Sequence, residues 1–177
     1  LRNVPDLARK ILRDLKLDRE SIEGGSHFAA LFSEEEVESP YALRKRIARY
    51  GLKMVRDFYE MRLALLHQDE EELYSPLESD LLESKRRTGE IIITKKQAES
   101  IVKERLLWIT KVESEKNCVS LSELMLSGKD LISLGVSPGK RMGEILQLAF
   151  DRVLQEPKEN EKEKLISYLQ ESGLLDS

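Results

Sequence analysis

The sequence predicts an all-α protein, with a helical bundle body followed by a small helical tail domain. Charged residues make up 35% of the 177 residues and aromatic residues only 6%, a composition typical of long solvent-exposed helices. Apolar residues recur three or four positions apart, and residues that favour helix starts recur after short gaps. The polar stretch 113–117 is the strongest interior boundary. We therefore expect a body over residues 1–113 and a tail domain over residues 114–177.

The first third of the body carries three helix signals. Pro5-Asp6 is expected to open a helix, and Gly24-Gly25 to interrupt the next one. Ser33 followed by Glu34-Glu35-Glu36 is typical of a helix N-terminus, where acidic side chains meet the positive end of the helix dipole. The apolar residues of the first helix have helical spacing: Leu7, Ile11, Leu12 and Leu15.

The stretch from Ser39-Pro40 to His67 has the 3.6-residue period of an amphipathic helix. Gly51 divides it, so we expect two helices that meet near Gly51, with one kinked helix as the alternative. Residues 41–56 contain six basic residues and no acidic one, which makes this the most basic segment of the chain: Arg44, Lys45, Arg46, Arg49, Lys53 and Arg56.

Residues 90–93 are the only β-like run, and they predict either a short extended segment or a buried helix entry. Thr94 and Gln97 have the spacing of a capping box for a helix that continues to Lys111. Four short units follow the boundary, and Gly135 and Gly173 are expected to end the second and the last of them. Their expected starts are Ser120 with Glu123, Ser127, Ser137-Pro138, and Asn160 with Glu163.

The net charge restricts the kind of function. With 29 basic and 33 acidic residues the formal charge is −4, so the chain cannot coat nucleic acid uniformly, and nucleic-acid binding has to come from local basic patches. The single cysteine, Cys118, excludes a disulfide framework and a cysteine-rich zinc site. No apolar run is long enough to span a membrane, and we expect a cytoplasmic location with no membrane partner. Because the chain starts at Leu1 inside a patterned segment, we expect a fragment of a larger protein.

One short signature imitates a catalytic site. Gly25-Ser26 followed by Glu34 and Glu36 resembles the Gly-Ser turn and paired acids with which nucleotidyltransferases hold two Mg²⁺ ions. No strand precedes or carries these acids, so a plain helix start is the better interpretation. His27 and His67 are isolated. We predict no catalytic residue and no metal site in this chain.

Residues 127–146 form the most specific segment. A helix that starts near Pro138 would present unpaired backbone N–H groups beside Lys140 and Arg141, and such groups bind phosphate. Gly139 and Gly143 lie four residues apart, so an RNA backbone or another helix could approach closely on that face. The alternative is a tight corner between two helices, in which the glycines serve only packing.

Two basic patches are therefore predicted to bind RNA, and 85–87 (Lys85, Arg86 and Arg87) is a third, weaker candidate. The alternative for each is a solvated charged surface. The predicted RNA-binding residues are Arg44, Lys45, Arg49, Lys53, Lys129, Gly139, Lys140, Arg141 and Gly143.

Residues 128–146 follow the pattern G-x-DL-x-x-LG-x-x-PG-x-x-x-G-x-x-L. This pattern resembles the C-terminal region of bacterial tRNA nucleotidyltransferases, the CCA-adding enzymes and their poly(A) polymerase relatives. The resemblance continues over 153–165 and, more loosely, upstream over 42–64. It implies a body and tail that grip the acceptor and TΨC region of tRNA for 3′-end nucleotide addition by an N-terminal catalytic domain.

The resemblance also implies which partners and cofactors belong to this chain. The partners are tRNA and the catalytic domain, and the parent protein is expected to be a nucleotidyltransferase. No cofactor is expected in this region, because Mg²⁺ with CTP or ATP would act in the catalytic domain. The alternative function is a helical protein-interaction or dimerisation module without an RNA role, which the apolar stripe from Leu43 to Leu65 favours and which allows for a homodimer.

Overall fold

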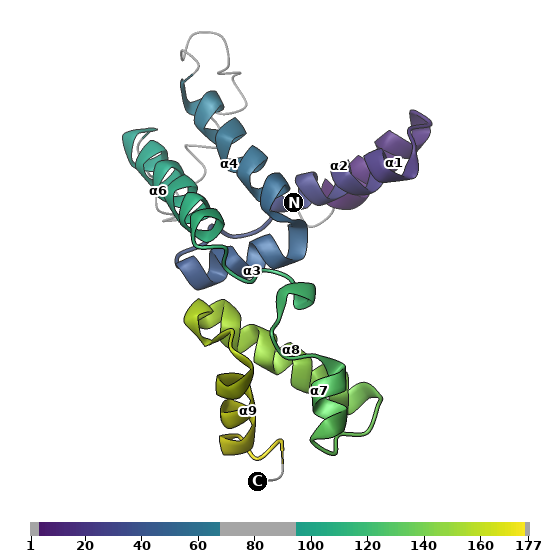
Figure 1. The fold of residues 1–177 in the computed structure, drawn as a ribbon. Coiled ribbons are helices and arrows are strands. Elements are labelled where there is room, and N and C mark those ends of the chain that lie inside the picture. Colours follow the sequence, from purple (N-terminus) through teal and green to yellow (C-terminus); the bar gives the residue numbers. More distant parts are fainter. Residues whose placement is uncertain (1–3, 68–94, 176–177) are drawn as a thin grey trace, which may run out of the picture. The chain divides into compact units, whose positions relative to one another are not determined.

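The computed structural model describes residues 4–67 and 95–175, and within these ranges every regular element is helical (Figure 1). The predicted all-α class is confirmed. The α-helices are α1 (Val4–Asp14), α2 (Arg19–Leu31), α3 (Pro40–Tyr50), α4 (Leu52–His67), α6 (Lys95–Ser114), α7 (Gly128–Ser133), α8 (Lys140–Gln155) and α9 (Lys162–Glu171). The described ranges also contain two 3₁₀ turns, η1 (Leu121–Glu123) and η2 (Pro157–Glu159).

The chain forms two compact units. Unit 1 comprises Leu1–Glu36 and Leu52–Thr110, and unit 2 comprises Val37–Gly51 and Lys111–Ser177. Helix α3 thus packs with the C-terminal segments, although it lies far from them in the sequence. The expected division into domains at 113/114 stays a prediction, because these units describe packing and not independent folding.

Gly25 lies in the middle of α2, so the prediction that Gly24-Gly25 interrupts a helix was wrong. A Cβ atom at Gly25 would lie 2.5 Å from Cδ1 of Leu12 on α1. The missing side chain therefore lets α1 and α2 approach closely. Ser26 Oγ, which is buried, donates a hydrogen bond to the Pro5 carbonyl at 3.2 Å in the same contact.

The acidic run after Ser33 does not begin a helix, contrary to the prediction, and α3 starts only at Pro40. Glu36 instead accepts a 2.7 Å hydrogen bond from the Tyr59 hydroxyl and pairs with Arg62, both on α4. Arg105 of α6 has its Nε 3.8 Å from the same carboxylate. The negative charge of Glu36 thus joins helices of unit 1 and does not serve a helix dipole.

The predicted start of α3 and the predicted break after it are confirmed. The Ser39 side chain accepts a 3.1 Å hydrogen bond from the Ala42 N–H, and Pro40 occupies the first turn. Gly51 has φ 87°, a left-handed conformation that favours glycine, and separates α3 from α4. The kinked single helix is therefore excluded.

The predictions for residues 90–93 and for a cap at Thr94 lie outside the described residues. Helix α6 continues to Ser114, three residues beyond the predicted end at Lys111.

Unit 2 has a core of apolar side chains from α7, α8, α9 and the segments between them, with Tyr41 and Ala48 of α3 packed against it. The capping boxes at Ser120 and Ser127 are confirmed, although the first opens only the 3₁₀ turn η1. Gly135 ends α7 with φ 85°, and the Val136 N–H donates to the Leu131 carbonyl at 2.9 Å. Gly173, with φ 68°, follows α9 as predicted. The buried members of the core include Leu126, Leu131, Ile145, Ala149, Val153, Leu165 and Leu169.

Two helix starts differ from the prediction. Helix α8 begins at Lys140, because Gly139 has φ 145° and ψ −163°, which keeps Ser137-Pro138 in the preceding turn. Helix α9 begins at Lys162, because the Asn160 side chain is bound elsewhere. It accepts a hydrogen bond from the Met125 N–H at 2.9 Å and donates one to the Glu123 carbonyl at 3.1 Å.

Candidate nucleic-acid interface

The hairpin between α7 and α8 exposes the N-terminus of a 16-residue helix. Gly139 is the N-cap of α8, and no side chain caps this end. The first N–H groups of an α-helix have no partner inside the helix, and they carry the positive end of its dipole. Because Gly139, Lys140 and Arg141 are all exposed, an anion can reach this end from solvent.

The glycines on this face leave open space. Apart from its chain neighbours and the nearby backbone of its own helix, a Cβ atom built at Gly139 or Gly143 would have no heavy atom within 4 Å. Gly128 at the start of α7 differs, because a Cβ there would lie 3.1 Å from Met142 Sδ in the first turn of α8. Within the described residues, close packing therefore explains Gly128 but not Gly143, whereas the φ of 145° at Gly139 favours glycine in the turn itself.

Basic side chains surround the start of α8. The Lys140 side chain is 91% exposed, and its Nζ lies 3.6 Å from Glu144. Arg141 Nη2 lies 3.5 Å from the Leu174 carbonyl, at the edge of a depression of about 250 Å³ lined by the hairpin and the segment after α9. Lys129 in the first turn of α7 is exposed, and its side chain makes no hydrogen bond or ion pair among the described residues.

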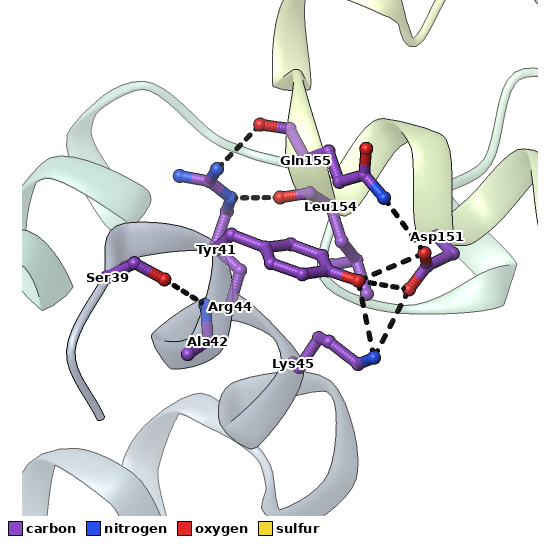
Figure 2. Close-up of polar contacts among 8 residues, drawn as sticks. All are labelled: Ser39, Tyr41, Ala42, Arg44, Lys45, Asp151, Leu154 and Gln155. Carbon is purple, nitrogen blue, oxygen red and sulfur yellow. Dashed lines mark hydrogen bonds and ion pairs between the residues drawn. The ribbon is translucent and has the colours of Figure 1, made fainter. Parts of the chain in front are cut away.

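Arg44, predicted to contact RNA, is bound inside unit 2. Its Nε donates to the Leu154 carbonyl at 2.6 Å and its Nη2 to the Gln155 carbonyl at 2.9 Å (Figure 2). These are carbonyls of the last turn of α8, where the helix leaves acceptors unpaired. Burial lowers the pKa of the Arg44 guanidinium. Arg44 thus fastens α3 to the end of α8.

Lys45 and Arg49 lie on the exposed part of α3. Lys45 Nζ lies 3.2 Å from the Tyr41 hydroxyl and 3.5 Å from Asp151, which also accepts a 2.8 Å hydrogen bond from that hydroxyl (Figure 2). The hydrogen bond to Tyr41 and the charge of Asp151 raise the pKa of Lys45. The Arg49 guanidinium stacks 5.0 Å from the centre of the Tyr50 ring.

Lys53, the fourth basic residue predicted for this patch, belongs to α4 in unit 1. Its Nζ bonds to Asp57 at 2.6 Å. The basic residues of 41–56 are therefore divided between the two units and do not form one patch within either. The third candidate, 85–87, lies outside the described residues.

The residues that imitate a nucleotidyltransferase signature make contacts within unit 1 instead. Ser26 is bound to the Pro5 carbonyl and Glu36 to Tyr59 and Arg62, so neither side chain is directed to a shared ion. In the part of the chain that the structure describes, no group of three or more His, Cys, Asp or Glu residues could hold a metal ion. Cys118 is buried, and burial raises the pKa of its thiol to about 11, which suits a packing role.

Sequence reasoning missed the role of Asp130, which holds the start of α7 in place. Its carboxylate accepts hydrogen bonds from the Ser127 N–H at 2.8 Å and from Lys162 Nζ of α9 at 2.6 Å. The bond from Lys162 and those from Ser127 hold the pKa of Asp130 far below its usual value. The Ser127-x-x-Asp130 spacing was the available signal, because it places the acid at the third helical position. Nothing in the sequence indicated Lys162.

None of the helices among residues 4–67 and 95–175 is both long enough and apolar enough to cross a membrane.

A family model described as tRNA nucleotidyltransferase domain 2 putative matches residues 79–169, which include α6, α7, α8 and most of α9. No curated protein and no solved structure matches the chain.

Proposed function

The chain belongs to the tRNA nucleotidyltransferase domain 2 family, and from this we propose that unit 2 binds tRNA through its phosphate backbone. The bound region would be the acceptor and TΨC arm, so that the 3′ end is held for nucleotide addition by an N-terminal catalytic domain of the CCA-adding type. In this proposal Mg²⁺ and CTP or ATP act in the catalytic domain, and the described region needs no cofactor. A cytoplasmic location belongs to the same proposal.

The observation that carries the proposal is the uncapped start of α8. The uncapped N–H groups of the first turn of α8, the open surface above Gly143 and the side chains of Lys140 and Arg141 occur together at one helix end. A helix N-terminus combined with basic side chains suits a phosphate, and a glycine surface lets a sugar-phosphate backbone come close. Lys129 lies in the first turn of α7, which packs against the first turn of α8 through Gly128 and Met142.

This arrangement suits RNA recognition by shape. Proteins bind A-form helices mostly through phosphates and 2′-hydroxyl groups, because the deep major groove hides the base edges. On a chain with a net charge of −4, a few basic sites favour one docking orientation, and the acidic surface elsewhere disfavours others. We base the proposal on the start of α8 and assign Arg44 to supporting α3. The RNA contacts predicted for Lys45 and Arg49 stay predictions and are not part of this proposal.

The test removes the two basic side chains at the start of α8 and compares the tRNA affinity of this variant with that of a matched control. In the double variant K140A/R141A, we expect the Kd for tRNA to rise about tenfold or more, because two phosphate contacts are lost. The slope of log Kd against log salt should fall by about two for the same reason.

The control is K111A/R19A. Lys111 pairs with Glu115 at 3.7 Å with i,i+4 spacing, as Lys140 does with Glu144, and Arg19 is 89% exposed with a similar i,i+4 partner. The control has the same net charge as the test variant, so it separates a local contact from general charge. An equal loss of tRNA affinity in both variants would overturn the assignment of the site to the start of α8.

A further inference from the structure

Unit 2 has a second surface feature, which adjoins the proposed RNA site at Gly143. A groove of about 810 Å³ runs between α3 and α8, with η1 at its edge. Its α3 wall carries Lys45 and Arg49, and its α8 wall carries Glu144 and Asp151. The two walls therefore have opposite charge.

The floor of the groove is apolar and open to solvent. Leu121 of η1 and Leu148 of α8 are 50% and 39% exposed, although both side chains are large and apolar. A second hollow of about 380 Å³ continues from Leu121 past Gly143 and Leu146. An apolar surface that extends over neighbouring hollows and is bordered by charges is typical of a protein interface.

One end of the groove is closed by contacts within the unit. Lys45 and Tyr41 both bind Asp151 there (Figure 2). Arg49 lies one helical turn beyond Lys45 on α3, and Glu144 lies two turns before Asp151 on α8. The open part of the groove thus has the positive charge of Arg49 on one wall and the carboxylate of Glu144 on the other, and this carboxylate also lies 3.6 Å from Lys140 Nζ of the same chain.

We infer that this groove binds a second copy of the same chain in a two-fold symmetric dimer. In such an interface the same patch faces itself, so each contact occurs twice and the patch must be complementary to itself. An apolar centre flanked by Arg49 on one side and Glu144 on the other meets this condition, because Arg49 of each copy can face Glu144 of the other. A nucleic acid in the same groove would meet the carboxylates of Glu144 and Asp151, which repel phosphate.

The inference does not rest on tRNA binding, and charge reversal tests it with the association state as the readout. The wild-type chain should show a concentration-dependent dimer in sedimentation velocity. In R49E and in E144K both symmetry-related contacts become repulsive, so each variant should dimerise about tenfold more weakly. In a mixture of the two variants, the mixed dimer has opposite charges at both contacts, so the mixture should dimerise about as well as wild type.

The matched control is the pair R19E and E23K, two exposed residues of α2 in unit 1. These variants should dimerise as the wild type does, alone and mixed. A second pair tests the apolar centre. L148E should dissociate the dimer, whereas I132E should not, because Ile132 on α7 is also about half exposed but does not line the groove. Circular dichroism of each variant shows whether the helices are retained.

A wild-type chain that is monomeric at every concentration overturns the inference. So does a mixture of R49E and E144K that dimerises no better than the separate variants. If L148E instead weakens tRNA binding and leaves the association state unchanged, the groove is an RNA site and the dimer interface is wrong.

Discussion

At the scale of single residues, Gly143 has open space where a side chain would lie. Substitutions at this position can therefore change the stability of α8 and the affinity for tRNA separately. Gly143→Ala should raise the free energy of unfolding by about 0.5–1 kcal/mol, because alanine is favoured over glycine inside a helix. Gly143→Leu should also fold, but its side chain would occupy the space assigned to the RNA backbone and weaken tRNA binding. Urea unfolding and tRNA titration of both variants check this. Wild-type affinity in the leucine variant would show that RNA does not contact this face.

Asp130 gives a prediction about pH. Because its pKa in the folded protein is lower than its usual value of 3.8, the carboxylate stabilises the fold fully above pH 3.8. That contribution is lost as the pH falls through the folded-state pKa. Asp130→Asn should therefore lower the melting temperature at pH 7, and the difference from wild type should shrink progressively below pH 3.8.

The control for this prediction is Glu171→Gln, which neutralises an exposed acid at the end of α9. It should melt like the wild type at every pH. A difference between Asp130→Asn and wild type that stays constant down to the lowest pH would contradict the linkage.

At the scale of helices, Arg44 tests how α3 is held to α8. Arg44→Ala should lower the free energy of unfolding by about 1.5–3 kcal/mol, because a charged donor is lost and two α8 carbonyls lose their partner. Arg19→Ala removes an arginine that is 89% exposed and should cost no more than about 0.5 kcal/mol. Chemical unfolding measures both. An equal loss of unfolding free energy in both variants would show that the Arg44 contact in Figure 2 does not hold α3 to α8.

Helix caps were predictable from the sequence where the cap is local. Ser39 and Ser127 bond to backbone groups three residues away, so the information lies within one turn. The same reasoning failed at Gly25 and at Asn160, because each residue contacts a segment that is distant in the chain. A glycine that ends a helix and a glycine that lets two helices approach have the same sequence signal.

At the scale of the whole molecule, the division into two units was not predictable. The apolar stripe from Leu43 to Leu65 favours an interaction module, although Gly51 is expected to divide it into two helices. All four of its buried members Leu43, Ile47, Val55 and Phe58 have helical spacing, yet the first two belong to unit 2 and the last two to unit 1. The contacts that place α3 in unit 2, such as Tyr41 with Asp151, join residues 110 positions apart, and no local pattern records such a pairing.

The candidate site was predictable only where its residues lie close together in the sequence. Gly139, Lys140, Arg141 and Gly143 lie within five residues, so the turn and the helix period suffice to bring them together. The basic run over 41–56 looked like one patch, yet Arg44 is used for packing and Lys53 lies in unit 1. Charge spacing alone does not tell whether a basic side chain faces solvent or a helix end.

The most direct test of the account is the salt dependence of tRNA binding by the wild-type chain. If unit 2 neutralises a few phosphates at the start of α8, the chain should bind tRNA at about 50 mM salt, and log Kd should rise linearly with log salt with a slope of about two to four. Sedimentation or fluorescence anisotropy with labelled tRNA measures this slope. No binding at low salt, or an affinity that salt does not change, would contradict the account.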